Sequence, residues 1–279
     1  MAEDLLVLSA LVRRELGLDF SEHLDQLERK AASRLAATHC ATIKEYLTLL
    51  AQAPFRAREL HELANVVTNN ETYFFREQGQ LSVVCGQVVS ELLADTNRRT
   101  AVKILSVPSS SGEEPYSIAM NLLMNNQPVG TRINIYGADV SDRALEAARA
   151  GLYRPLAFRG VAPDIMQRFF QVQGDVHVLD PSVRRLVQFF HANLLDPGSM
   201  KTAAPYDIIF CRNVMIYFDA ETQQRVIEGL TSMLVPGGYL CLGHADATAS
   251  LYTFFDVRIF FGSMLYRRKQ NPAMATAQV

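Results

Sequence analysis

Short apolar segments, each followed by a stretch with helical periodicity, constrain the fold of this chain more than any other feature. They cover residues 102–107, 133–138 and 206–211. A strand that is apolar along its whole length has both faces buried, which is typical of parallel sheets covered by helices on both sides. The alternation therefore predicts an α/β domain with a parallel sheet, to which residues 239–243 add a further strand.

The first 67 residues have a purely helical pattern. Leucine and valine recur every three or four residues from Leu5 to Leu16, and Gly17 follows as a stop signal. Ser21 is predicted to cap a second helix and Thr42 a third, which is expected to end at Pro54. A fourth helix is predicted over 58–67. We therefore expect residues 1–67 to form an N-terminal helical subdomain.

Residues 68–267 then form the sheet domain, and its βα alternation breaks between residues 152 and 192. A short helix over 164–170 is followed there by two β-like pieces, 171–179 and 186–190. We expect this segment to be a small β-rich insertion. Two more strands flank Gly262 as a terminal hairpin, and 268–279 is predicted to be a flexible tail or linker.

Composition excludes several classes of protein. The formal net charge is −2, which argues against a protein held to nucleic acid mainly by phosphate neutralisation. No apolar run approaches the roughly 18 residues of a membrane span, and the N-terminus lacks the basic region of a secretory signal. The 4 cysteines are widely spaced, without a CxxC pair, and predict reduced thiols in a cytoplasmic protein without a disulfide framework or zinc site.

The loop after the first strand, residues 107–112, is the strongest local signal for a ligand. Its serines and Gly112 allow a close approach of the backbone, where a strand turns into a helix. Glu113 and Glu114 would repel a phosphate but suit an ammonium or sulfonium centre. The alternative is an ordinary capped helix start with Pro115 in its first turn, which leaves the paired glutamates unexplained.

Asp139 ends the second strand. An acidic residue at this place in a Rossmann-like unit typically accepts the ribose hydroxyls of an adenosine, although it could also cap the next helix. Asp139 and a loop that disfavours phosphate together favour a ligand that contains adenosine but no diphosphate. This combination favours S-adenosylmethionine over NAD.

Two further segments carry polar residues beside apolar ones. Residues 69–76 combine an aromatic cluster, which we expect in the core, with Arg76, a cation that needs an acidic partner. Residues 207–218 form a buried strand whose end delivers Arg212, Asn213 and Tyr217 to the same sheet edge as Asp139. Tyr217 could equally be a core tyrosine.

These segments together resemble the CheR chemotaxis-receptor methyltransferases, over nearly the whole chain. The resemblance rests on N-x-T-x-F-F-R (70–76), S-G-E-E-P-Y-S (111–117), G-A-D-V-S (137–141), N-L-L (193–195) and F-C-R-N-V-M-I-Y-F (210–218). It implies a Rossmann-like class I S-adenosylmethionine-dependent methyltransferase domain, an N-terminal helical subdomain and a small inserted antiparallel β-subdomain (152–192). It also implies methyl transfer to glutamate side chains on the cytoplasmic helices of methyl-accepting chemoreceptors.

The resemblance also implies the site. The cofactor contacts of the family fall on Asn70, Thr72, Arg76, Glu114, Asp139, Asn193, Leu194, Arg212 and Asn213. Arg76 and Tyr217 match the catalytic positions beside the transferring methyl, and no metal ligand is implied. A glutamate with a pKa near 4.3 is already ionised at neutral pH, so the reaction needs no general base and none of the 6 histidines is assigned a role.

The expected partners follow from the same resemblance. The insertion is a few residues shorter than in members that grip a receptor's C-terminal pentapeptide, which argues against tethering by such a tail. The second predicted helix carries Arg29, Lys30 and Arg34 among acidic neighbours, which predicts either weaker electrostatic docking through this helix or docking to a different receptor. The lengthened tail resembles members that continue into a further interaction module.

Alternative functions remain open at this point. An NAD-dependent oxidoreductase would require a glycine fingerprint that residues 109–112 lack. A catalytically degenerate receptor-binding scaffold would be expected to lose Glu114, Asp139 or Arg76. The slightly negative net charge, and the absence of a segment that could stack against a flipped base, disfavour a nucleic-acid or small-molecule methyltransferase.

Overall fold

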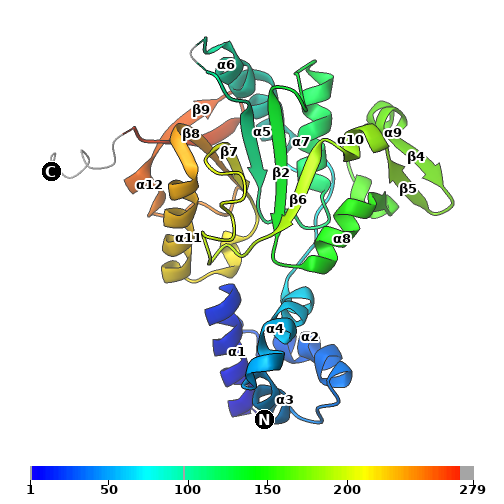
Figure 1. The fold of residues 1–279 in the computed structure, drawn as a ribbon, viewed down its shortest axis with the longest axis vertical. Helices are drawn as coiled ribbons and strands as arrows, with labels where there is room; N and C mark the ends of the chain where they lie inside the picture. Colours follow the sequence, from blue (N-terminus) through cyan, green and yellow to red (C-terminus); the bar gives the residue numbers. More distant parts are fainter. Residues whose placement is uncertain (1, 97, 271–279) are drawn as a thin grey trace.

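A mixed sheet forms the centre of the molecule. In the computed structural model, which describes residues 2–96 and 98–270, its seven strands lie in the order β6-β2-β1-β7-β8-β10-β9 (Figure 1). Their bounds are β1 Val102–Ser106, β2 Ile133–Asp139, β6 Val187–His191, β7 Tyr206–Cys211, β8 Leu234–Leu242, β9 Phe255–Phe260 and β10 Ser263–Arg268. All neighbours from β6 to β8 pair in parallel, whereas β10 pairs antiparallel with β8 and β9.

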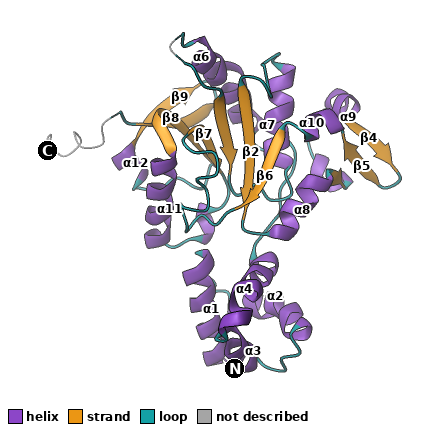
Figure 2. Cartoon of the chain, in the orientation of Figure 1, coloured by secondary structure: helices purple, strands orange, loops and turns teal. Residues whose placement is uncertain are grey.

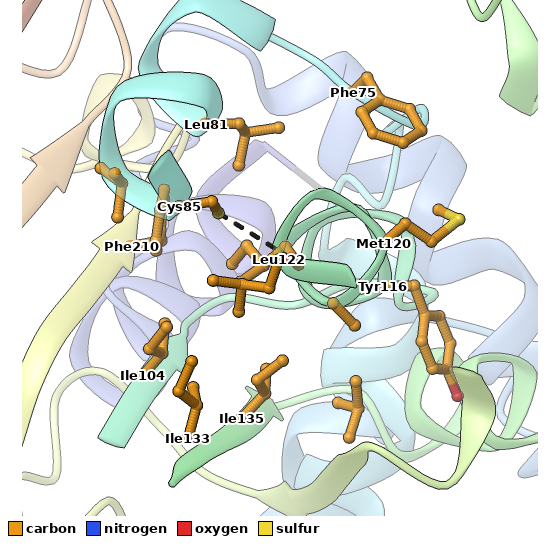
Figure 3. Close-up of a cluster of buried hydrophobic side chains, with 14 of the residues drawn as sticks. Phe75, Leu81, Cys85, Ile104, Tyr116, Met120, Leu122, Ile133, Ile135 and Phe210 are labelled. Carbon is orange, nitrogen blue, oxygen red and sulfur yellow. Dashed lines mark hydrogen bonds between the residues drawn. The ribbon is translucent and has the colours of Figure 1, made fainter. Parts of the chain in front are cut away.

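Helices cover both faces of this sheet, as the apolar strands predicted. Ile104 belongs to one hydrophobic cluster and its chain neighbour Leu105 to the other, because successive residues of a strand point to opposite faces. Figure 3 shows the first cluster, where Leu81, Cys85 and Leu122 meet strand side chains such as Ile104. Outside the inserted segment, the helices of this domain are α5 Gln78–Val83, the π-helix Val84–Val88, α6 Val89–Ala94, α7 Glu113–Met124, α8 Asp142–Ala150, the 3₁₀-helix Met215–Tyr217, α11 Ala220–Met233 and α12 Leu251–Phe254.

The N-terminal helices form a separate bundle with its own core. They are α1 Ala2–Leu16, α2 Leu24–Ala37, α3 Ile43–Leu50 and α4 Ala53–Val67, and they lie at one end of the sheet (Figure 2). Leu8, Leu27, Tyr46 and Leu63 are fully buried among them. The Rossmann-like fold with an N-terminal helical part is therefore confirmed.

Some local predictions for this bundle hold and others are wrong. Thr42 caps α3 by accepting a hydrogen bond from the Glu45 amide. Ser21 caps nothing, because α2 begins only at Leu24. Pro54 does not end α3 but lies in the first turn of α4, where proline is tolerated because its missing N–H would have no helical partner.

The inserted segment forms a small antiparallel sheet, as predicted, but it is shorter than expected. Its elements are β3 Leu152–Tyr153, the 3₁₀-helix Pro155–Phe158, α9 Pro163–Phe169, β4 Phe170–Gln173, β5 Val176–Leu179 and α10 Pro181–Arg184, with strand order β3-β5-β4. The piece predicted over 186–190 is β6, which pairs in parallel with β2 in the main sheet. β6 is an edge strand of the main sheet, so the insertion ends before it and is shorter than the predicted range 152–192.

Other boundaries differ in detail. The turn expected at 236–238 lies within β8, where the register against β7 shifts between Tyr206 and Ile208. The hairpin across Gly262 is present as β9 and β10. Most of the predicted tail, residues 271–279, lies outside the described residues. None of the helices in the described part of the chain combines the length and apolar character that a membrane span requires.

The aromatic cluster predicted in the core connects the insertion to the main domain. Phe74 is 1% exposed and its ring lies 5.1 Å from Phe158, 4.7 Å from Tyr153 and 5.0 Å from Phe170. These aromatic partners come from the inserted segment, so Phe74 anchors it. Burial of such a ring stabilises the fold more than most single contacts.

We expect Phe74→Ala to lower the free energy of unfolding by roughly 3–5 kcal/mol, because it removes a buried ring from a packed aromatic cluster. Urea denaturation followed by circular dichroism would measure it. Phe261→Ala is the matched control, since this ring is fully exposed at the hairpin tip. Equal midpoints and slopes for the two variants would contradict the anchoring role.

Candidate active site at the carboxyl edge of the sheet

A cleft lies where the strand order reverses, between β1 and β7. Strands run from β1 outward to β2 and β6 on one side and from β7 to β8 on the other, which is the place where open α/β sheets bind ligands. Predicted cofactor residues that line this cleft are Asn70, Asp139, Asn193, Leu194 and Asn213. Residues far apart in the sequence thus meet at one edge.

Asp139 lies at the end of β2 with its carboxylate fixed by the backbone. The Ser110 amide donates to Oδ2 at 2.8 Å, and the Ser141 amide donates to Oδ1 at 2.9 Å. Asp139 is only 2% exposed, and burial raises its pKa, although these hydrogen bonds oppose the shift. The carboxylate oxygens keep lone pairs free to accept the hydroxyls of a ribose.

The loop before α7 brings its backbone against this carboxylate. Gly112 adopts a φ of +94°, and a Cβ there would lie 2.9 Å from the Cβ of Ala148. Glu113 does not line the cleft. It is buried, accepts a hydrogen bond from Ser111 Oγ at 2.7 Å, and burial raises its pKa. The expectation that both glutamates face the ligand therefore fails for Glu113, because the first turn of α7 directs it into the protein.

Glu114 instead belongs to a buried charge network beside the cleft. Its Oε1 accepts from Ser106 Oγ at 2.8 Å, and Oε2 lies 2.7 Å from Nε of Arg212, whose side chain is 2% exposed. Arg212 also donates to the Arg76 carbonyl at 2.6 Å and to Gln80 Oε1 at 3.4 Å. A guanidinium next to a carboxylate matches the zwitterionic amino-acid end of S-adenosylmethionine, which carries both charges.

Arg76 and Thr72, like Glu114 and Arg212, are not among the residues that line the cleft. Arg76 and Thr72 are both half-buried, and the Arg76 guanidinium lies 5.6 Å from the centre of the Tyr73 ring. Within residues 2–96 and 98–270 this guanidinium has no acidic partner, so its positive charge is available to a ligand. The Arg76 carbonyl accepts a hydrogen bond from Arg212, which connects residues 69–76 to the charge network of Glu114.

Sequence reasoning missed Asp246, which organises the end of β7. Asp246 is 1% exposed and accepts hydrogen bonds from the amides of Asn213, Met215 and Gly243. Asn213 has a φ of +59°, so its backbone needs this support. A signal existed in the sequence, because Asp246 follows the end of β8 just as Asp139 ends β2.

The cleft is narrow and is covered by N-terminal residues. Its volume is about 70 Å³, whereas pockets for small ligands typically have roughly 300–1,000 Å³. Leu16 lines it, and Asn193 Nδ2 donates to the Glu15 carbonyl at 2.7 Å.

Tyr217 lies between this cleft and a larger groove of about 650 Å³. Its hydroxyl accepts a hydrogen bond from Asn69 Nδ2 at 2.9 Å, and its side chain is 36% exposed, which excludes the core alternative. The groove is also lined by Lys30 of α2 and by Ile216 and Asp219. Asn69, Tyr217 and Phe218 line both cavities, so the groove and the cleft adjoin at these residues.

We expect Asp246→Asn to weaken S-adenosylhomocysteine binding about tenfold. The asparagine side chain has one acceptor oxygen, and its NH₂ group would face the backbone N–H donors. At least one buried backbone N–H would then lack an acceptor, at a cost of about 1–3 kcal/mol. Calorimetric titration of the variant measures the effect. Asp256→Asn, at an exposed residue of β9, is the control; the same affinity in both variants would show that Asp246 does not position the site.

For Asp139→Ala we expect at least a tenfold rise in Kd for S-adenosylhomocysteine, because hydrogen bonds to a charged group contribute about 1.5–3 kcal/mol. The raised pKa of Asp139 also predicts that wild-type affinity falls on acidification, at a higher pH than for an ordinary aspartate, since only the ionised form accepts both hydroxyls. Calorimetry across pH tests both points. An unchanged Kd would refute the ribose assignment, and Asp164→Asn in the exposed insertion serves as the control.

Comparison with known proteins agrees with this geometry. Residues 3–68 match the CheR methyltransferase all-alpha domain, and residues 70–258 match the CheR methyltransferase SAM binding domain. A chemotaxis protein methyltransferase of Vibrio parahaemolyticus is 39% identical over 77% of this chain and 78% of its own length. The chemotaxis protein methyltransferase of Escherichia coli is 33% identical over 90% of this chain and 86% of its length.

A probable biofilm formation methyltransferase, WspC of Pseudomonas aeruginosa, is 36% identical over 85% of this chain, which spans only 56% of that relative. The helical domain and the sheet domain of this chain thus match the two domain models of one family. This protein belongs to the CheR methyltransferases and is an S-adenosylmethionine-dependent methyltransferase.

Proposed function

We propose that this protein methylates glutamate side chains on the cytoplasmic helices of a methyl-accepting chemoreceptor, in the cytoplasm, giving glutamate methyl esters and S-adenosylhomocysteine. The observation that carries this proposal is the junction of the cofactor cleft and the open groove at Tyr217. A side chain entering from the groove would arrive beside the cofactor. The names of the relatives, which are chemotaxis methyltransferases, support a receptor as the acceptor.

The chemistry requires positioning more than proton transfer. A carboxylate oxygen of the acceptor attacks the methyl carbon, and the electrons of the breaking carbon–sulfur bond neutralise the sulfonium sulfur. No proton moves, because the glutamate is already ionised. The protein's share is to align the acceptor and to exclude water, and orientation alone can contribute roughly 7–11 kcal/mol.

We assign this alignment to Arg76 and Tyr217. The Arg76 guanidinium has no acidic partner in the described part of the chain, so it can form a charge-assisted hydrogen bond with the acceptor carboxylate. The Tyr217 hydroxyl is held by Asn69 at the mouth of the cleft. The remaining predicted cofactor contacts, Thr72 among them, are proposed to act in binding S-adenosylmethionine.

The receptor would dock across the groove with little help from basic residues of α2. Arg34 forms hydrogen bonds of 2.9 and 2.8 Å with Glu59, which also accepts one from Tyr46, so Arg34 supports the bundle. Lys30 donates to the Thr68 carbonyl at 3.2 Å, although it also lines the groove. Arg29 is exposed but lies 3.0 Å from Asp25. Shape at the groove, more than charge on α2, would select the receptor.

Incubation with radiolabelled S-adenosylmethionine and a panel of receptor cytoplasmic fragments tests the proposal. Fragments from chemotaxis and from biofilm-formation receptors belong in the panel, because the relatives include both kinds of methyltransferase. We expect base-labile label on the fragments, as an ester requires. Normal binding of S-adenosylhomocysteine without label on any fragment would favour the receptor-binding scaffold.

For Arg76→Ala we expect kcat/KM to fall about 100-fold or more, as for the loss of a charge-assisted positioning contact. Tyr217→Phe should lower kcat while leaving the affinity for S-adenosylhomocysteine unchanged. Arg159→Ala is the matched control, because this guanidinium also contacts the Tyr73 ring, at 4.1 Å. Wild-type methylation by the Arg76 variant would remove Arg76 from the mechanism.

A further inference from the structure

Three potential metal ligands meet at the junction between the N-terminal bundle and the sheet domain. His61 belongs to α4, Asp142 is the first residue of α8, and His191 is the last residue of β6. One ligand atom from each lies within 4.8 Å of the others. None of them has a role in the cofactor cleft or in the methyl transfer described above.

Their chemistry and spacing suit a transition-metal ion. Two imidazoles and a carboxylate, with a further position open to water, are common ligands of zinc. Bonds of about 2.0–2.2 Å place neighbouring ligand atoms of a tetrahedral site roughly 3.3–3.6 Å apart. His61 Nδ1 already lies 3.5 Å from Asp142 Oδ2.

A small rotation of His61 would complete this arrangement. The His61 and His191 rings are stacked with centres 4.7 Å apart and planes 20° from parallel, so one ring must turn for both lone pairs to reach one ion. The His61 side chain is 55% exposed and is free to do so. The Asp142 side chain is also half-exposed, at 48%.

His191 is oriented as a metal-bound histidine usually is. Its Nε2 lies 3.1 Å from the Val140 carbonyl. A carbonyl only accepts, so Nε2 carries the proton and Nδ1 keeps the lone pair that binds a metal. Such a backbone contact fixes the ring and its tautomer, as in many zinc sites.

The backbone around the three residues is also held in place. Asn65 of α4 accepts hydrogen bonds from Ser141 Oγ at 2.8 Å and from the Arg143 amide at 3.2 Å, which join α4 to the start of α8. Carboxylates and guanidinium groups both line the adjoining hollow, among them Glu62, Glu146 and Arg58. The charge of the hollow therefore does not favour a cation, and the preference for a transition-metal ion must come from the two imidazole ligands.

We propose that His61, Asp142 and His191 form a divalent transition-metal site of the zinc type that links the two domains. The bound ion would fix α4 against α8 and β6. His191 pairs in the sheet with Asp139, so the site adjoins the strand end that carries the ribose-binding carboxylate. This site is independent of the receptor assignment, because its occupancy is measured without methyl transfer.

Equilibrium dialysis of the full, untagged, chelator-treated chain against Zn²⁺, with metal analysis, tests the proposal. We expect one saturable equivalent per chain, and a loss of at least tenfold in affinity for His61→Ala and for His191→Ala. His39→Asn is the matched control, because His39 is an exposed histidine of the same bundle and asparagine tolerates its φ of +56°. Circular dichroism confirms that each variant is folded.

Substitution with Co²⁺ identifies the ligands independently. We expect visible ligand-field absorption typical of nitrogen and oxygen ligands in the wild type and in His39→Asn, and none in His191→Ala. A thiolate charge-transfer band would place the ion at a cysteine such as Cys40 and overturn the assignment. So would binding that does not saturate, or binding that is equal in all variants, because either result indicates adventitious metal.

Discussion

The buried ion pair between Glu114 and Arg212 is the interaction on which the rest of the site depends. A guanidinium that is 2% exposed requires an acidic partner, since an unpaired buried charge is strongly destabilising. The pair joins β1 through Ser106, α7 through Glu114 and the end of β7 through Arg212. Because Arg212 also binds the Arg76 carbonyl, the aromatic segment before α5 is fixed relative to the sheet. One charge pair thus sets the shape of the cofactor edge.

The N-terminal bundle lines the candidate active site as well as forming a separate domain. The Asp19 amide donates to the Tyr217 carbonyl at 3.0 Å, and Asn193 donates to the carbonyl of Glu15. These contacts place the bundle over the carboxyl ends of the strands (Figure 1). Cofactor entry, acceptor access and the proposed metal link therefore all depend on how this bundle meets the sheet. A movement between the domains would change all of them together.

The comparison between sequence and structure shows where local patterns suffice. The strand predicted over 206–211 has the same bounds in the structure, because a buried strand carries its own signal in an apolar run. Residues 186–190 were recognised as a strand but assigned to the insertion. A short apolar strand does not encode its partner, and only the pairing of β6 with β2 decides it. Glu113 was misplaced for a similar reason, since the turn into α7 determines which way it points.

The sequence by itself determined the alternation of strands and helices, the sheet edge at which a ligand is expected, and the family motifs that identify the cofactor. These features are local in the chain or are shared with relatives. Only the tertiary structure decided that Asp246 supports Asn213, that Arg34 is used inside the bundle, and that His61, Asp142 and His191 lie together. Each of these depends on contacts between residues distant in sequence. Such contacts are fixed by the packing of whole elements, which no short stretch of sequence specifies.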